Sequence, residues 1–214
     1  MIIATELQRT EEWERVRQGV PTASQFRRIM SGTNLSVSAQ QDAYAMELAA
    51  ARNGVKIGLF KGNEHTERGH RMEPAACSFY EFMEGVDVQK VGFVWRDEKK
   101  NVGCSPDGLL GSSGGIEIKC PTEKTHLKYV KENKLPSEYI PQVFGSMWIT
   151  GREFWDFISY SEESEPMIVR TTFEDEHYKR WLEKWQTVFA DFELLVEQKE
   201  EEFHKNKREI EEYF

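Results

Sequence analysis

The sequence predicts an α/β fold, an α+β sandwich in which a central mixed β-sheet is flanked by helices. Short segments with alternating apolar residues fill the middle of the chain, and helix-forming segments precede and follow them. Strands surrounded by helices in mixed order indicate such a sandwich. The 214 residues suit one domain, which we expect to span 1–214 with a helical extension from about residue 175.

Helices are expected in the first third of the chain. The segment 22–30 begins with Thr22 and Ser24, whose hydroxyl groups suit a helix N-cap, and the segment 42–53 is rich in alanine. The polar stretch from Ser31 to Ser38 predicts a loop. Helices are therefore expected over 11–17, 22–30, 42–53 and 63–83, the last of them interrupted by Pro74.

Strands are expected in the middle of the chain. Alternating apolar residues predict strands over 86–95 and 101–104, which continue into a turn at Asp107 and a strand that carries Glu117. Helices over 123–133 and 138–149 and strands over 154–160 and 167–173 follow. From Asp175 to Phe214 the pattern predicts a long amphipathic helix, broken near Ala190.

Three charged residues stand out on two short apolar segments joined by a Gly/Ser turn: Asp107, Glu117 and Lys119. Residues two apart in a strand share a face, so Glu117 and Lys119 project together, while Ile116 and Ile118 face the opposite side. Glycines and serines between Asp107 and Glu117 let the chain fold back as a hairpin. The hairpin brings Asp107 beside Glu117.

This arrangement predicts a metal-dependent nuclease site. Two carboxylates at one point repel one another, which favours a hard divalent cation, Mg²⁺ or Mn²⁺, as the compensating charge. Such a metal polarises a phosphodiester and supplies a nucleophile, while Lys119 can orient or activate the attacking water and stabilise a phosphoryl oxygen. Either piece alone is more often a turn or a solvated surface pair, so the prediction depends on their combination.

At these residues the chain resembles the PD-(D/E)XK nuclease superfamily, and within it the phage lambda exonuclease/YqaJ-type viral recombinase family. The letters Ser-Pro-Asp-Gly from Ser105 and Glu-Ile-Lys-Cys-Pro from Glu117 match the family's motif nearly letter for letter. Further matching blocks cover 13–24, 69–76 and 141–148. The resemblance implies a restriction-endonuclease-like core.

The resemblance also implies roles for residues in and around this core. An additional carboxylate lies near the metals, a glutamine helps to hold the water or the lysine, and a backbone carbonyl completes the ligands. The implied catalytic residues are Lys119, Glu117, Asp107 and Gln142, and the implied metal ligands are Asp107, Glu117, Glu73 and the carbonyl oxygen of Ile118.

A second set of residues suits a terminal phosphate. A guanidinium group with hydroxyls and a helix N-terminus nearby is good chemistry for this ligand, and Arg17, Ser24 and Ser105 supply the side chains. In similar enzymes such a pocket holds the 5′-phosphate of DNA. Where relatives carry a basic residue shortly after the Lys-Cys-Pro strand, this chain offers Lys124 or His126. A lysine there lacks the bidentate geometry of arginine.

The activity that the resemblance implies is a Mg²⁺-dependent exonuclease, with Mn²⁺ as a substitute metal. It would degrade one strand of linear double-stranded DNA from the 5′ end, releasing mononucleotides and leaving a 3′ overhang. The implied assembly is a homotrimer on DNA ends, with a single-strand annealing protein as partner, encoded by a phage or prophage. Two alternatives stay open: an endonuclease or repair nuclease of the superfamily, and a non-catalytic DNA-end-binding module.

The net charge of −9 is unexpected for a protein that binds DNA. Acidic residues are dense over 197–214 and in the loop 162–165, whereas basic residues gather over 15–28 and 119–134. Because local fields rather than net charge steer a ligand, we expect a positive channel with an acidic exterior.

Two further features concern location and redox state. No stretch approaches the ~20 apolar residues that cross a membrane, and no secretory signal is visible, so a cytoplasmic location in a bacterial host cell is expected. Cys77, Cys104 and Cys120 are widely spaced, which favours buried, reduced thiols.

Overall fold

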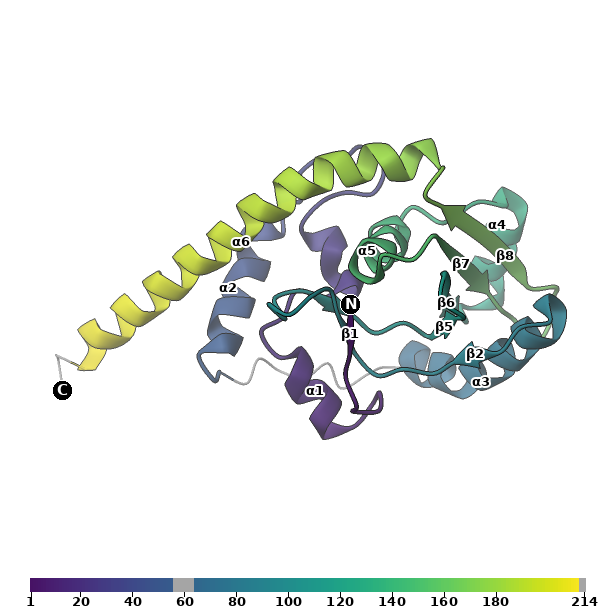
Figure 1. Cartoon of the computed structure of the whole chain (residues 1–214), viewed down its shortest axis with the longest axis horizontal. Helices are drawn as coiled ribbons and strands as arrows, with labels where there is room; N and C mark the ends of the chain where they lie inside the picture. The colour runs from purple at the N-terminus through teal and green to yellow at the C-terminus, as the bar shows by residue number, and fades with distance from the viewer. Residues whose placement is uncertain (56–63, 212–214) are drawn as a thin grey trace.

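The computed structural model of the protein describes residues 1–55 and 64–211. Its main sheet is mixed and has five strands. Strands β6 and β7 are parallel, and the other neighbours are antiparallel. The sheet confirms the predicted fold class (Figure 1). In spatial order its strands are β2 (Val88–Gln89), β5 (Gly108–Leu110), β6 (Gly114–Lys119), β7 (Phe154–Ser159) and β8 (Met167–Thr172).

A smaller antiparallel sheet joins β1 (Ile2–Ile3), β3 (Val94–Trp95) and β4 (Gly103–Cys104). The single strand predicted over 86–95 is therefore wrong, because β2 belongs to the large sheet and β3 to the small one. Gly92 lies between them, where a Cβ atom would stand 1.7 Å from the backbone oxygen of Glu6. A glycine here lets the N-terminal segment approach the chain closely.

Helices cover both faces of the large sheet. Helix α3 packs on the side of Ile116 and Ile118, and α5 packs on the side of Phe157. In chain order the helices are α1 (Glu11–Arg17), the 3₁₀ helix η1 (Ala23–Arg28), α2 (Gln41–Arg52), α3 (Glu64–Glu84), α4 (Glu123–Glu132), α5 (Ile140–Thr150) and α6 (Glu176–Glu211).

Three helix predictions need correction. The segment 22–30 forms a 3₁₀ helix, and the Thr22 side chain bonds Ser24 Oγ instead of capping it. Helix α3 continues through Pro74, and α6 continues through Ala190. Val188, Phe192 and Val196 are buried and lie four residues apart, before and after Ala190. They form one packed helical face, which keeps α6 continuous. Residues 63 and 212–214 of the predicted helices lie outside the described residues.

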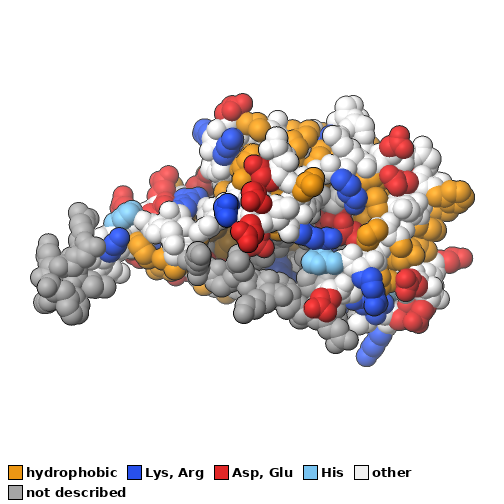
Figure 2. Space-filling model, turned by 90° about the horizontal axis from the view of Figure 1, so that it is seen from below, with side chains coloured by type: hydrophobic (Ala, Val, Ile, Leu, Met, Phe, Trp, Pro, Cys, Tyr) orange, Lys and Arg blue, Asp and Glu red, His pale blue; other side chains and the backbone are white. Residues whose placement is uncertain are grey.

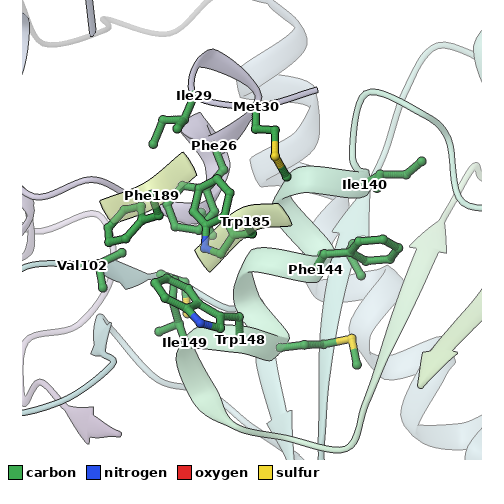
Figure 3. Packing of buried hydrophobic residues seen from close by; sticks show 14 of the residues in the cluster. Phe26, Ile29, Met30, Val102, Ile140, Phe144, Trp148, Ile149, Trp185 and Phe189 are labelled. Carbon is green, nitrogen blue, oxygen red and sulfur yellow. The ribbon is translucent and has the colours of Figure 1, made fainter. Parts of the chain in front are cut away.

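The largest core cluster holds α5 in place. Phe26 of η1 and Trp185 of α6 pack with ring centroids 4.3 Å apart, and Trp148 of α5 lies against Trp185 at 5.7 Å (Figure 3). A Cβ atom at Gly145 would stand 2.3 Å from the Phe26 ring, so the glycine lets α5 and η1 meet closely. Helix α5, which carries Gln142, is therefore held by both η1 and α6.

The remaining two features concern thiols and membrane spans. Cys77, Cys104 and Cys120 are buried and free, as predicted. Among residues 1–55 and 64–211, no helix combines the length and the apolar character needed to cross a membrane.

Candidate active site

The predicted hairpin brings Asp107 against the strand that carries Glu117 and Lys119. Strand β5 pairs with β6 so that Gly108 lies opposite Ile116, and Gly111 takes a left-handed φ of +49° in the turn. The backbone N–H of Ile118 donates to Asp107 Oδ2 at 2.6 Å. This bond fixes the Asp107 carboxylate beside Ile118, near the C-terminal end of β6.

Glu117 is the most enclosed of these side chains, with 2% of its surface exposed. Lys119 Nζ donates to Glu117 Oε1, as the alternation along the strand predicted. Gln142 Nε2 donates to the same oxygen at 2.6 Å from the first turn of α5. The structure therefore joins Glu117, Lys119 and Gln142 in one hydrogen-bonded group, with Asp107 on the neighbouring turn.

Burial sets the protonation of this group. Desolvation, and next the charge of Glu117, raises the pKa of Asp107 to about 7. Desolvation also raises the pKa of Glu117, against the opposing effect of Lys119. For Lys119, burial lowers the pKa, but Glu117 and Asp107 outweigh it and hold the pKa above its ordinary value. Lys119 is thus an ammonium at neutral pH, beside two carboxylates that share it.

Glu73 approaches the same group from α3, and its charge raises the pKa of both Asp107 and Glu117. Its carboxylate is paired with two cations, Arg9 Nη2 and, at 3.5 Å, Lys90 Nζ. Across the described part of the chain, no three acidic, histidine or cysteine side chains converge closely enough to hold a metal ion. Of the predicted ligands, Asp107 and Glu117 lie on neighbouring segments, whereas Glu73 is held by cations.

The site opens into a cleft of about 1520 Å³. Glu73, Asp107, Ile118 and Lys119 line one end of it, although the Ile118 side chain packs in the core beneath. Arg17 lines the same cleft from α1. One continuous space therefore connects the acidic group with a candidate phosphate ligand.

The predicted phosphate-binding residues are linked through Trp13. Arg17 stacks on the Trp13 ring at 4.0 Å, and Trp13 Nε1 donates to Ser105 Oγ at 3.1 Å. The Arg17 Nε atom is buried and has no hydrogen-bond partner among the residues that the structure describes. Desolvation by burial lowers the pKa of Arg17. Ser24 is not part of this chain of contacts. Its Oγ atom is hydrogen-bonded to Oγ1 of Thr22, a residue of the cleft lining, at 3.2 Å.

The two candidates for the missing basic residue lie elsewhere. Lys124 is exposed on α4 and is not part of the cleft lining. His126 is buried, and its ring nitrogens bond Ser159 Oγ at 2.8 Å and the Glu165 carbonyl at 3.0 Å. His126 therefore holds α4 against the end of β7.

The positive channel expected from the sequence is formed only in part. Arg9, Arg15 and Arg17 line the cleft, but Glu11 and Glu14 line it too. The basic residues of α4 and Arg27 and Arg28 do not contribute to the lining. Figure 2 accordingly shows acidic and basic side chains intermingled on this side of the molecule.

Sequence reasoning missed three residues at the site. Arg9 and Lys90 pair with Glu73, and the Tyr139 ring lies 5.3 Å from Lys119 Nζ. The sequence could have identified Tyr139, because it precedes Gln142 by three residues and so shares its helical face. It gave no indication of Arg9, which is 64 positions from Glu73.

Solved structures similar to this chain include an alkaline exonuclease, LHK-Exo, from Laribacter hongkongensis. It is 32% identical, with a TM-score of 0.75, and the match covers 92% of this chain and 99% of that one. The same enzyme in complex with dAMP matches with 31% identity and the same TM-score and coverage. A phage-related exonuclease from Haemophilus somnus 129PT shares the fold at 16% identity, with a TM-score of 0.54 over 84% of this chain and 96% of that one.

Sequence comparison gives one curated relative and one family. The relative is uncharacterized protein R354 of Acanthamoeba polyphaga mimivirus, 26% identical over 165 residues. Those residues are 71% of this chain and only 28% of the mimivirus protein. The family model for the YqaJ-like viral recombinase domain matches residues 12–153, which include Asp107, Glu117, Lys119 and Gln142. The chain belongs to the YqaJ-like viral recombinase domain family.

Proposed function

We propose that this chain, an enzyme of the alkaline exonuclease type, is a Mg²⁺-dependent 5′-to-3′ exonuclease on linear double-stranded DNA. It would release mononucleotides and leave 3′ single-stranded overhangs. The observation that carries the proposal is the group formed by Asp107, Glu117 and Lys119, in which two buried carboxylates share one ammonium. The complex of LHK-Exo with dAMP supports DNA as the substrate.

Asp107 and Glu117 have the chemistry of ligands for a divalent metal ion. Desolvation raises the pKa of both carboxyl groups, and the charge of Glu117 raises that of Asp107 further, so a hard cation beside them would stabilise their ionised forms. The residues that would hold it are Asp107, Glu117, Glu73 and the Ile118 carbonyl, with Mg²⁺ or Mn²⁺ as the ion. When bound, the metal would polarise the phosphodiester and lower the pKa of water.

The chain's own residues would then orient the reaction. Lys119, held as an ammonium, can donate a hydrogen bond to the attacking water or to a non-bridging phosphate oxygen and stabilise negative charge there. Gln142 fixes Glu117 by a bond from the well-packed helix α5, so it acts as a positioning residue. Tyr139 limits the movement of Lys119 from the opposite side.

The part of the cleft around Arg17 suits the 5′ end. The buried Nε atom of Arg17 has no hydrogen-bond partner among the described residues, and a terminal phosphate would supply an acceptor. Ser105 is connected to Arg17 through Trp13, and Ser24 is bonded to Thr22 of the cleft lining. We propose that Arg17, Ser24 and Ser105 bind the 5′-phosphate, with Lys124 contacting the DNA from its exposed position outside the cleft lining.

The wider assembly is proposed from the family. A homotrimer around DNA ends would retain a substrate that a protein of net charge −9 attracts weakly. A single-strand annealing protein would bind the exposed 3′ strand, and the site of action would be the cytoplasm of a bacterium that carries the phage or prophage. We further propose that 1–214 acts as one nuclease domain, with α6 as its helical extension.

The test is to incubate the protein and Mg²⁺ with linear duplexes carrying 5′-phosphate or 5′-hydroxyl ends, and with a closed circle. Mononucleotides are expected from the phosphorylated linear duplex, with the circle intact. Lys119→Ala should be inactive, whereas Lys128→Ala, an exposed lysine of α4, should behave as wild type. Cleavage of the circle would replace the proposal by an endonuclease, and binding without any cleavage would leave only an end-binding module.

A further inference from the structure

The carboxylate of Glu73 is neutralised from two directions. Arg9 Nη2 pairs with one oxygen, and Lys90 Nζ lies 3.5 Å from the other. Lys90 also donates to the backbone oxygen of Asp107 at 2.8 Å. The Arg9 side chain is 43% exposed and that of Glu73 20% exposed, so this cluster sits at the cleft surface. The cations therefore occupy a carboxylate of the site that solvent reaches.

Arg9 is held in this position by the segment around it. Gln8 Nε2 donates to the carbonyls of Val91 at 2.9 Å and Pro106 at 2.7 Å, which ties the segment to the residue before Asp107. Arg9 itself has a φ of +69°, an uncommon conformation for a residue other than glycine. Thr10 then caps α1. A local conformation held by bonds on both sides aims this guanidinium at Glu73.

The charges explain why this contact matters. Glu73 acts electrostatically on both Asp107 and Glu117, so three carboxylates lie within one field. Lys119 compensates two of them, and Arg9 with Lys90 compensates the third. A divalent cation that uses Glu73 as a ligand must first displace the Arg9 guanidinium from that oxygen, because one oxygen cannot serve both at full strength.

We propose that Arg9 competes with the divalent cation for Glu73, so that it lowers the metal affinity of the site. This inference rests on the proposed metal-dependent function. Arg9 stabilises the carboxylate cluster while the metal is absent, and it turns away into the cleft when the metal binds. It is a positioning residue of Glu73 rather than a catalytic residue.

The experiment measures the binding of Mn²⁺ alone, without DNA, by electron paramagnetic resonance at fixed pH. Arg9→Gln should bind Mn²⁺ about three- to fivefold more tightly than wild type, the size expected when a half-exposed ion pair is lost. Arg15→Gln is the matched control, because Arg15 also lines the cleft but pairs with Glu11 and Glu12. The Mn²⁺ affinity of this variant should equal that of wild type.

A double-mutant cycle identifies Glu73 as the contested ligand. In a Glu73→Gln background, Arg9→Gln should leave Mn²⁺ affinity unchanged, because the contested carboxylate charge is gone. Thermal unfolding checks that each variant is folded, and Lys90→Gln is a second variant with the same expected direction. Unchanged or weaker Mn²⁺ binding in both Arg9→Gln and Lys90→Gln would overturn the inference alone. Failure of wild type to bind Mn²⁺ at all would overturn the metal-dependent function as well.

Discussion

Two buried carboxylates on neighbouring strands of the central sheet have opposite surroundings. Glu117 of β6 points to the α5 side, and Asp156 of β7, opposite Ile116 in the ladder, points to the α3 side. Arg170 donates to both oxygens of Asp156, at 2.8 and 2.7 Å, and the Tyr80 hydroxyl donates a third bond. Asp156 therefore has a cation of its own.

Glu117 has no cation that pairs with it alone. Its partner Lys119 also compensates Asp107, so the α5 side of the sheet carries two buried carboxylates for one ammonium. The difference separates a structural acid from a functional one: the first is matched by donors within the fold, whereas the second leaves negative charge for a ligand to neutralise. Burial alone does not distinguish them, since both are almost fully enclosed.

The largest effect should follow from removing the surplus charge. Asp107→Asn keeps an oxygen that can accept from the Ile118 N–H, but loses the carboxylate that we propose as a metal ligand. We expect the rate of DNA hydrolysis to fall by about 10³-fold or more, the size typical of a lost electrostatic contribution. The free energy of unfolding should stay equal or rise, because a repelled buried charge is gone. Single-turnover digestion and urea unfolding measure the two quantities, and a destabilised variant would contradict the comparison.

The matched change on the other face should have the opposite profile. Asp156→Asn leaves Arg170 and Tyr80 without their shared acceptor charge, so the free energy of unfolding should fall by about 2–3 kcal/mol. The half-exposed Arg170 keeps this below the cost for a fully buried pair. Activity per folded molecule should persist. Urea unfolding is the measurement, with the exposed Asp191→Asn as control, and loss of activity in a stable Asp156→Asn protein would erase the distinction.

The remaining effect is a dependence of stability on pH in EDTA. The pKa of Asp107 is about 4 in an unfolded chain and about 7 in the fold. The folded state binds this proton more tightly, so the free energy of unfolding should fall as the pH rises from about 4 to about 7, by at most ~1.4 kcal/mol per pH unit. Urea unfolding across this range should show a steeper fall for wild type than for Asp107→Asn. Equal slopes of the free energy of unfolding against pH in the two proteins would mean that Asp107, like Asp156, has its charge compensated within the fold.

The sequence predicted the parts of the site that depend on local geometry. Alternation placed Glu117 and Lys119 on one face, and the Gly/Ser turn returned Asp107 to them. Contacts between distant segments carry no comparable periodic signal, which is why Arg9 at Glu73 was missed. The roles of all these residues in catalysis, metal binding and phosphate binding stay predictions.

The same division applies to the fold. The mixed sheet and the helices predicted over 11–17 and 123–133 follow from the residue pattern. The split of 86–95 into two sheets depends on the approach of Glu6 to Gly92, and the continuity of α6 depends on its packing against η1 and α2. Both are tertiary effects that override local preference.

Helix α6 has a consequence for how the site is supported. Trp181, Trp185 and Phe192 lie in the same core cluster as residues of η1, α2 and α5, and the Lys199–Asp42 and Arg52–Glu200 pairs join α6 to α2. No described residue of α6 lines the cleft. The support behind Gln142 therefore comes from a helix outside the site, so a change in α6 would reach the site through α5.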